Sequence, residues 1–130
     1  QTILPKLKTD FMEIVESCIN GSLQSINIDW YDEKTICIVL CSKGYPENFI
    51  NNIEIFNLEK FDLKNNEFIF HAGTKNIDSK IFSNGGRVLN FVIRSNDLKQ
   101  ARKTAIKLID QLSWNNGFFR KDIGHKIIDK

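Results

Sequence analysis

The sequence predicts an α+β fold, in which a mostly antiparallel sheet carries a covering helix. Two segments, 5–20 and 96–112, place apolar residues at steps of three and four, which is typical of amphipathic helices. Between them lie short apolar runs separated by turns rich in Gly, Asn and Asp, which is typical of strands. The 130 residues contain no internal repeat and no low-complexity linker, so a single hydrophobic core is expected.

The first predicted helix starts near Pro5, which suits a first turn, and stops at Asn20-Gly21, which suits a C-terminal end. Its apolar positions share one face: Leu7, Phe11, Ile14, Val15, Cys18 and Ile19. This stripe needs a partner that covers it.

From Ser25 the apolar period changes to two. Residues 26–30 alternate with polar residues and predict a strand with one buried face, whereas 35–41 are apolar at both parities and predict a strand buried on both faces. The turn at 32–34 lies between them, so we expect these two strands to pair.

The rest of the chain predicts three more strands and one more helix. The strands are expected at 53–58, 67–71 and 87–94, and the helix begins after Ser95 or Asn96, either of which can cap it. One helix face is apolar: Leu98, Ala101, Ala105, Leu108, Ile109 and Leu112. Residues 115–130 are predicted to be irregular.

Composition excludes several classes of protein. The net charge is only +2, and no run of about 18 apolar residues occurs, so neither a nucleic acid nor a membrane is an expected partner. Three cysteines, two of them (Cys37 and Cys41) in an apolar run, fit a reducing cytoplasm. With two distant histidines and no Cys-x-x-Cys pair, no metal site is predicted.

The best candidate site is the turn Ser83–Leu89. Gly85 and Gly86 can bring backbone N–H groups close to an anion, and Arg87 adds a fork of charged donors. From the residues alone, a tight hairpin turn with a surface arginine is the commoner structure for this pattern.

Other candidates are weaker. His71 closes an apolar strand, and Arg120 and Lys121 follow two aromatic residues near the C-terminus; each of these could border a site or serve structure alone. The basic helix residues Lys99, Arg102, Lys103 and Lys107 indicate a solvated face. No nucleophile with a base and no carboxylate pair is evident, so no catalytic residue is assigned.

Ordered phrases along the chain carry a resemblance. They are Leu4–Asp10, Trp30, Ile38–Pro46, Phe70–Thr74, Asn84–Leu89 and Arg120–Gly124. Together they resemble the C-terminal part of the phosphoribosylamine–glycine ligase family, ATP-grasp enzymes of purine biosynthesis. The chain departs from the family at Lys43, Glu47 and Asn57, where glycine is usual.

The resemblance implies that residues 1–21 are the last helix of an ATP-grasp domain and that 22–130 are the C-terminal domain. The implied enzyme is an ATP-dependent carbon–nitrogen ligase that joins glycine to 5-phosphoribosylamine through glycyl phosphate. ATP and Mg²⁺ would be bound by the region upstream of Gln1, the partner of this chain in the same polypeptide. The chain alone is therefore expected to be inactive.

For the site, the resemblance implies that Arg87, with Gly85 and Gly86, holds the 5-phosphate. Arg120, Lys121 and His71 are expected at the border of the substrate cleft. The alternative is a separate, non-catalytic module that binds a phosphosugar or a partner protein.

Overall fold

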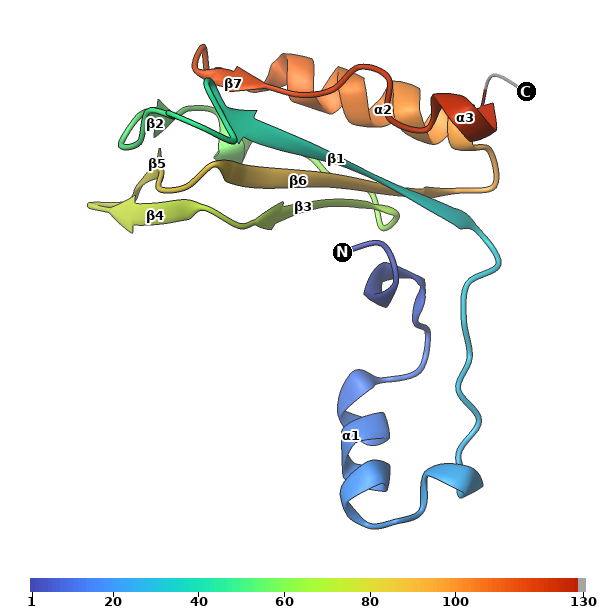
Figure 1. The fold of residues 1–130 in the computed structure, drawn as a ribbon. Helices are drawn as coiled ribbons and strands as arrows, with labels where there is room; N and C mark the ends of the chain where they lie inside the picture. The colour runs from blue at the N-terminus through green and yellow to red at the C-terminus, as the bar shows by residue number, and fades with distance from the viewer. Residues whose placement is uncertain (129–130) are drawn as a thin grey trace.

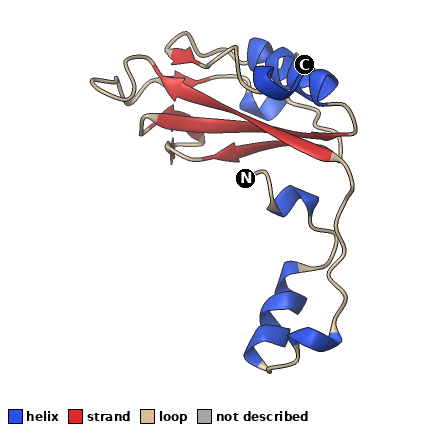
Figure 2. Ribbon diagram, turned by 45° about the vertical axis from the view of Figure 1, so that its right-hand side comes forward, coloured by secondary structure: helices blue, strands red, loops and turns tan. Residues whose placement is uncertain are grey.

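Residues 1–128 are described in this computed structural model, and they form a sheet, a covering helix and a separate N-terminal arm (Figure 1). The main sheet is antiparallel, with strand order β3-β6-β1-β7. The bounds are β1 Lys34–Ser42, β3 Glu67–His71, β6 Arg87–Ser95 and β7 Gly117–Phe118. Helix α2 (Leu98–Gln111) lies over one face (Figure 2). The predicted fold class is confirmed.

A second, three-stranded sheet was not predicted. Its antiparallel order is β2-β5-β4, with bounds β2 Glu54–Ile55, β4 Thr74–Ile77 and β5 Lys80–Ser83. Asp78 and Ser79 join β4 to β5 with φ of 50° and 63°. A hairpin turn of this kind is usually recognised in a sequence by an Asn-Gly pair, and here Asp-Ser stands in its place. The strand expected at 53–58 is reduced to β2, followed by a single bridge between Phe56 and Ser113.

The core lies between α2 and the main sheet. Alternate residues of β1 and β6 meet the helix, and the central contributors are Ile36, Ile38, Leu40, Leu89, Phe91 and Ile93. Ala101 and Ala105 of α2 are fully buried, because small side chains let the helix approach the sheet closely. The apolar face predicted for this helix is confirmed.

The predicted strand at 26–30 was wrong. Only Trp30 makes a strand-like bridge, and its partner is Leu7 of the arm. The neighbours of β1 are β6 and β7, and β6 pairs with it from Lys34↔Ser95 onward. Alternation identifies an extended segment but does not identify its partner strand. The long β6 supplies hydrogen bonds to far more backbone groups of β1 than the short segment 26–30 could.

The first helix starts later than predicted. Helix α1 spans Phe11–Ile19 and is capped by Asp10, whose carboxylate accepts a 2.7 Å hydrogen bond from the Met12 backbone N–H. Pro5 lies instead in a separate 3-10 turn, Leu4–Lys6. The chain between them is extended, because Lys8 N–H donates to the Asp29 carbonyl at 2.9 Å.

Two details of the C-terminal half also differ from prediction. The cap of α2 is Asp97, whose carboxylate accepts from Lys99 N–H at 2.8 Å, because Ser95 still belongs to β6. Residues 115–130 were expected to be irregular, yet they include β7, which pairs with the end of β1, and a short helix α3 (His125–Ile128).

Arg94 of β6 joins the arm to the sheet. Its side chain is almost fully buried; Nε lies 2.8 Å from Oε2 of Glu33, and Nη1 donates to the Pro5 carbonyl at 2.6 Å. Its guanidinium carbon lies 3.5 Å from the centre of the Tyr31 ring. Beyond this contact the arm, with α1 and the 3-10 turn Leu23–Ser25, extends away from the sheet (Figure 1).

Candidate anion-binding site

The turns predicted to carry the site come together at one end of the main sheet. Ser42 donates through N–H to the Gly86 carbonyl and through Oγ to the Gly85 carbonyl, each at 2.8 Å. Gly73 N–H donates to the Arg87 carbonyl at 2.8 Å. The phrases around Ser42, Gly73 and Gly85 are therefore joined by backbone hydrogen bonds.

The glycines allow these turns to touch each other. A Cβ on Gly86 would lie 2.1 Å from Cδ2 of Tyr45, and one on Gly73 would lie 2.7 Å from the Arg87 carbonyl oxygen. A Cβ on Gly85 would lie 3.2 Å from Cα of Gly73. Packing between turns thus accounts for the glycines, and a further role in approaching an anion stays a prediction.

A cavity of about 600 Å³ opens beside these turns. Its lining residues are Gln1, Val39, Tyr45, Phe49, Ala72, Gly73, Gly86, Arg87 and Asn90. A second, more apolar cavity of about 360 Å³ is lined by Cys37, Val39, Cys41, Tyr45, Pro46, Arg87, Phe118, Phe119, Arg120 and Ile123. Arg87 borders both, so its guanidinium can serve a ligand in either.

A β-bulge sets the direction of Arg87. Leu89 pairs with Leu40, but the next partner of β1, Cys41, is paired with Arg87, so Val88 is the extra residue. Strict alternation would place positions 87 and 90 on opposite faces of the sheet. The bulge brings Arg87 to the face that Asn90 and Cys41 share, away from α2.

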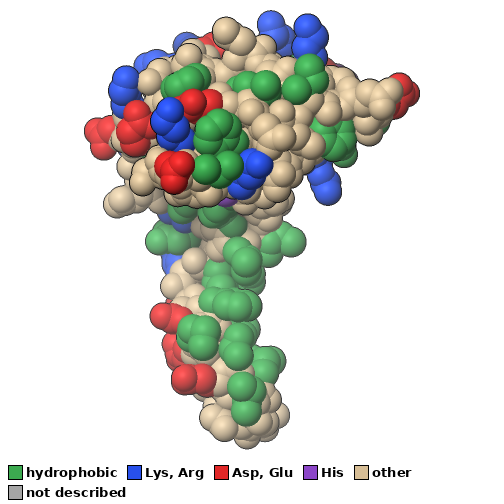
Figure 3. All heavy atoms as spheres, turned by 90° about the vertical axis from the view of Figure 1, so that its left-hand side faces the viewer, with side chains coloured by type: hydrophobic (Ala, Val, Ile, Leu, Met, Phe, Trp, Pro, Cys, Tyr) green, Lys and Arg blue, Asp and Glu red, His purple; other side chains and the backbone are tan. Residues whose placement is uncertain are grey.

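Arg87 is exposed, and among residues 1–128 its side chain makes no hydrogen bond or ion pair. Figure 3 views the end of the sheet toward which these turns project, where basic, acidic and hydrophobic side chains are interspersed. An unengaged guanidinium beside a cavity can form paired, charge-assisted hydrogen bonds to a phosphate or carboxylate.

The other predicted site residues are placed unevenly. Arg120 lines the apolar cavity with Arg87, but it pairs with Asp122 through Nε (3.0 Å) and Nη2 (2.5 Å). The hydrogen bond from Arg120 lowers the pKa of the Asp122 carboxyl. Lys121 lines neither cavity, and its carbonyl accepts from Arg102. His71 also lines neither, and its Nδ1 lies 2.9 Å from Oγ1 of Thr74.

The two thiols near Arg87 are held in their neutral form. Burial raises the pKa of Cys37 and of Cys41, and the charge of Arg87 opposes this effect at Cys41 without reversing it. Neither thiol is therefore activated as a nucleophile.

Sequence reasoning missed Asn90. It is 3% exposed and lines the larger cavity, three positions after Arg87. The available signal was a polar amide inside an otherwise apolar run, Val88–Ile93, where an uncompensated polar side chain is costly.

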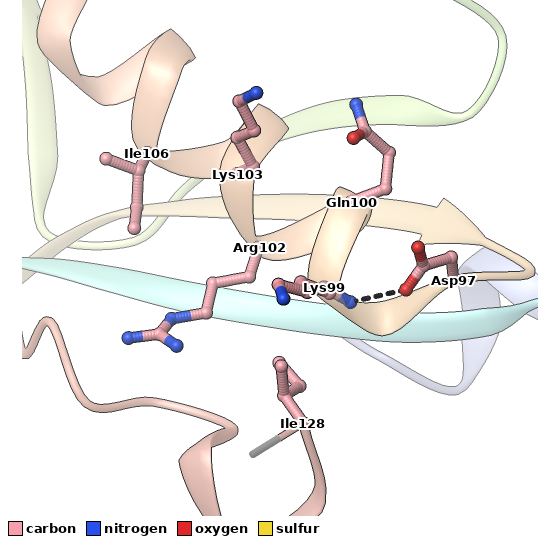
Figure 4. Close-up of a pocket in the computed structure, with 7 residues that line it drawn as sticks. All are labelled: Asp97, Lys99, Gln100, Arg102, Lys103, Ile106 and Ile128. Atoms are coloured by element: carbon pink, nitrogen blue, oxygen red, sulfur yellow. Dashed lines mark hydrogen bonds between the residues drawn. The ribbon is translucent and has the colours of Figure 1, made fainter.

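Another cavity, of about 440 Å³, lies along α2 (Figure 4). Its lining residues are Asp97, Lys99, Gln100, Arg102, Lys103, Ile106 and Ile128. Asp97 is already engaged as the helix cap, and Arg102 bonds to the Lys121 carbonyl. None of the residues predicted to form the site lines it, so we regard it as a surface groove with solvated cations.

Residues 1–128 contain neither a metal-binding cluster nor a membrane-spanning helix. No group of three or more His, Cys, Asp or Glu side chains there could hold a metal ion. In the same part of the chain, no helix has the length and apolar character needed to cross a bilayer.

The comparison with known families matches residues 35–126 to the family described as phosphoribosylglycinamide synthetase, C domain. The chain belongs to this family. The match runs from the second residue of β1 into α3, so it includes nearly all of the main sheet, the second sheet and the covering helix. It also includes every lining residue of the two cavities beside Arg87 except Gln1. The resemblance found in the sequence is confirmed at the level of the family.

Curated relatives of this C domain extend the similarity into the arm. The chain is 41% identical over 123 residues to the phosphoribosylamine–glycine ligase of Caldanaerobacter subterraneus subsp. tengcongensis, and 40% identical over 125 residues to that of Fusobacterium nucleatum subsp. nucleatum. Each alignment covers 95% of this chain but only 29% of the relative. The chain thus spans less than a third of the curated relatives it matches.

A solved structure shows the same fold. The crystal structure of phosphoribosylamine–glycine ligase from Thermotoga maritima superposes with a TM-score of 0.62 at 24% identity. The superposition covers 85% of this chain and 27% of that protein.

Proposed function

We propose that this chain is the C-terminal part of a phosphoribosylamine–glycine ligase and that the cavity beside Arg87 binds phosphoribosylamine. The ligase joins glycine to the sugar amine with conversion of ATP to ADP and phosphate. The observation that carries the proposal is the exposed, unengaged guanidinium of Arg87. It lies at a cavity lined mostly by the segments that carry the family resemblance.

In this proposal Arg87 binds the 5-phosphate. Two parallel N–H···O bonds from one guanidinium suit a phosphate dianion in charge and in geometry. Arg120 lies at the edge of the same region, but its Nε and Nη2 bond to Asp122, whose carboxylate offsets the positive charge, so it contributes less than Arg87. Holding the phosphate would orient the sugar amine toward the activated glycine.

ATP and Mg²⁺ are assigned to the part of the ligase that this chain does not span. Residues 1–128 contain no cluster of His, Cys, Asp or Glu suited to a metal ion. Gln1 lines the cavity, so any residues that precede it are attached beside the proposed substrate. A site completed by that region would bring the substrate and the ATP machinery together. The proposed compartment is the cytoplasm, as the cysteine content predicts.

The proposed domain boundary follows the arm. Residues 1–21 would be the terminal helix of the ATP-grasp region, and 22–130 the C-terminal domain. The exposed apolar side chains of α1 support this division, since a helix with an uncovered apolar face needs a partner.

Steady-state kinetics of Arg87→Ala in the complete polypeptide test the proposal. Loss of the charged bonds should lower kcat/KM for phosphoribosylamine by about 30- to 1,000-fold, about 2 to 4 kcal/mol, while KM for ATP changes little. Arg87→Lys should also be impaired, because it keeps the charge but loses the fork.

Lys107→Ala removes an exposed cation of α2 that lies outside both cavities, and it is the matched control. Near-normal phosphoribosylamine kinetics in folded Arg87→Ala would reject the phosphate site. A separate binding module, the alternative function, predicts phosphosugar binding without any coupling to ATP turnover.

A further inference from the structure

Asn90 is a polar residue at the buried centre of β6. Its backbone pairs with Val39 of β1 on one side and with Phe70 of β3 on the other. These strand contacts use the main chain alone, so an apolar side chain would complete the sheet equally well. The amide therefore needs a reason outside the sheet.

The amide is not satisfied within the described residues. Oδ1 has one weak partner, the Cys37 thiol at 4.0 Å, and Nδ2 is buried without a hydrogen-bond partner among residues 1–128. A buried amide donor without a partner lowers stability. A half-turn of the amide exchanges Nδ2 and Oδ1, so either group can be directed at the cavity that Asn90 lines.

Arg87 and Asn90 border one cavity from one strand. The bulge at Val88 puts both side chains on the same face of the sheet. Their positions along the strand differ by about 10 Å at most, and the long arginine side chain can shorten that separation. The cavity thus offers a cation for an anionic end of a ligand and a buried amide for its polar body.

We propose that the Asn90 amide hydrogen-bonds a ring hydroxyl of the phosphorylated sugar whose phosphate Arg87 holds. This inference rests on the proposed function and adds the residue that selects ribose. A hydroxyl both donates and accepts, as does the amide, so the pair is complementary in either amide orientation. A sugar that lacks this hydroxyl leaves the buried amide unpaired and is rejected.

The proposal separates stability from binding. Asn90→Leu keeps the side-chain size and removes the unpaired donor, so the 130-residue chain should melt at the same temperature or a few degrees higher. The same substitution should weaken sugar binding. A purely structural asparagine predicts the opposite pattern, with lower stability and unchanged binding.

Calorimetric titration of the complete polypeptide tests the binding half. The probe is ribose 5-phosphate, a stable analogue without the amine, compared with its 2-deoxy and 3-deoxy forms and with inorganic phosphate. Wild type should prefer ribose 5-phosphate to at least one deoxy form by about tenfold. Asn90→Leu should bind ribose 5-phosphate about tenfold more weakly, lose that preference and bind inorganic phosphate unchanged.

Thr35→Val is the matched control. Its Oγ1 is likewise buried without a partner, yet Thr35 lines neither cavity beside Arg87. This variant should also keep or raise the melting temperature, with ribose 5-phosphate affinity unchanged.

The outcomes separate the two proposals. If Arg87→Ala abolishes ribose 5-phosphate binding but Asn90→Leu leaves affinity and sugar preference intact, only the role of Asn90 is overturned. If Arg87→Ala has no effect, the proposed function fails and the inference fails with it. Should Asn90→Leu not fold, equal binding of all three sugars by wild type still overturns the inference.

Discussion

At the scale of single residues, the space around each glycine of the site shows whether packing alone excludes a side chain there. Gly73 has no room for a Cβ, because backbone atoms of Arg87 and Gly85 lie within 3 Å of its ideal position. Gly85 has more room, with its nearest neighbour at 3.2 Å. Gly85 should therefore tolerate alanine better than Gly73 does.

Gly73→Ala should lower the free energy of unfolding by about 2 to 3 kcal/mol, because the backbone must shift. Gly85→Ala should change it by less than about 1 kcal/mol, since the small clash is offset by lower entropy of the unfolded chain. Urea unfolding measures both. If Gly85→Ala is stable yet loses ribose 5-phosphate binding, Gly85 has the ligand role that the sequence predicts; equal destabilisation of the two variants would contradict the packing analysis.

At the scale of elements, the cap of α2 shows why a helix start is hard to place. Ser95, Asn96 and Asp97 are all good cap residues, and the choice among them depends on where β6 ends. Ser95 still pairs with Lys34, and its Oγ accepts from Asp97 N–H at 3.2 Å. The carboxylate of Asp97 is left to cap the helix and to complement its dipole.

Asp97→Ala should therefore lower the free energy of unfolding by about 1 kcal/mol. Asn96→Ala is the matched control, because Asn96 is exposed and makes no side-chain hydrogen bond among residues 1–128; its effect should stay within about 0.5 kcal/mol. Thermal or urea unfolding of the two variants gives the comparison. A larger loss for Asn96→Ala would restore the cap that the sequence suggested.

At the scale of the whole molecule, the arm is the part that lacks a partner. Three large side chains of α1 are strongly exposed, Phe11 at 54%, Met12 at 60% and Ile19 at 79%. Figure 3 shows the hydrophobic side chains that run along the arm. The contact through Arg94 fixes the base of the arm and leaves α1 uncovered.

In the 130-residue chain, amides of residues 11–19 should therefore exchange with solvent far faster than those of β6. The exposed apolar face of α1 should also cause the chain to self-associate. Substitution of Phe11 and Ile19 by Ser should reduce this self-association without changing the exchange of β6. Hydrogen exchange with sedimentation measures both. Equal protection of the arm and β6 in a strictly monomeric sample would contradict the view that α1 docks on another region.

The sequence by itself determined the fold class, β3, the extents of β1 and β6 to within a residue, and the apolar face of α2. These features depend on local periodicity, and burial of the same residues confirms them. The ordered segments along the chain, from Leu4–Asp10 to Arg120–Gly124, also identified the family. Local patterns of apolar residues are sufficient to predict these strands and this helix face, because each of them lies within one segment of the chain.

Only the tertiary structure decided which segments pair and which side chains share a cavity. The partner of β1 is the distant β6, not the neighbouring segment 26–30, because pairing depends on the whole length of a strand. The bulge at Val88, invisible in the period of the sequence, places Arg87 on the face of Asn90. Pairing and register are properties of two segments at once, so neither segment alone contains them.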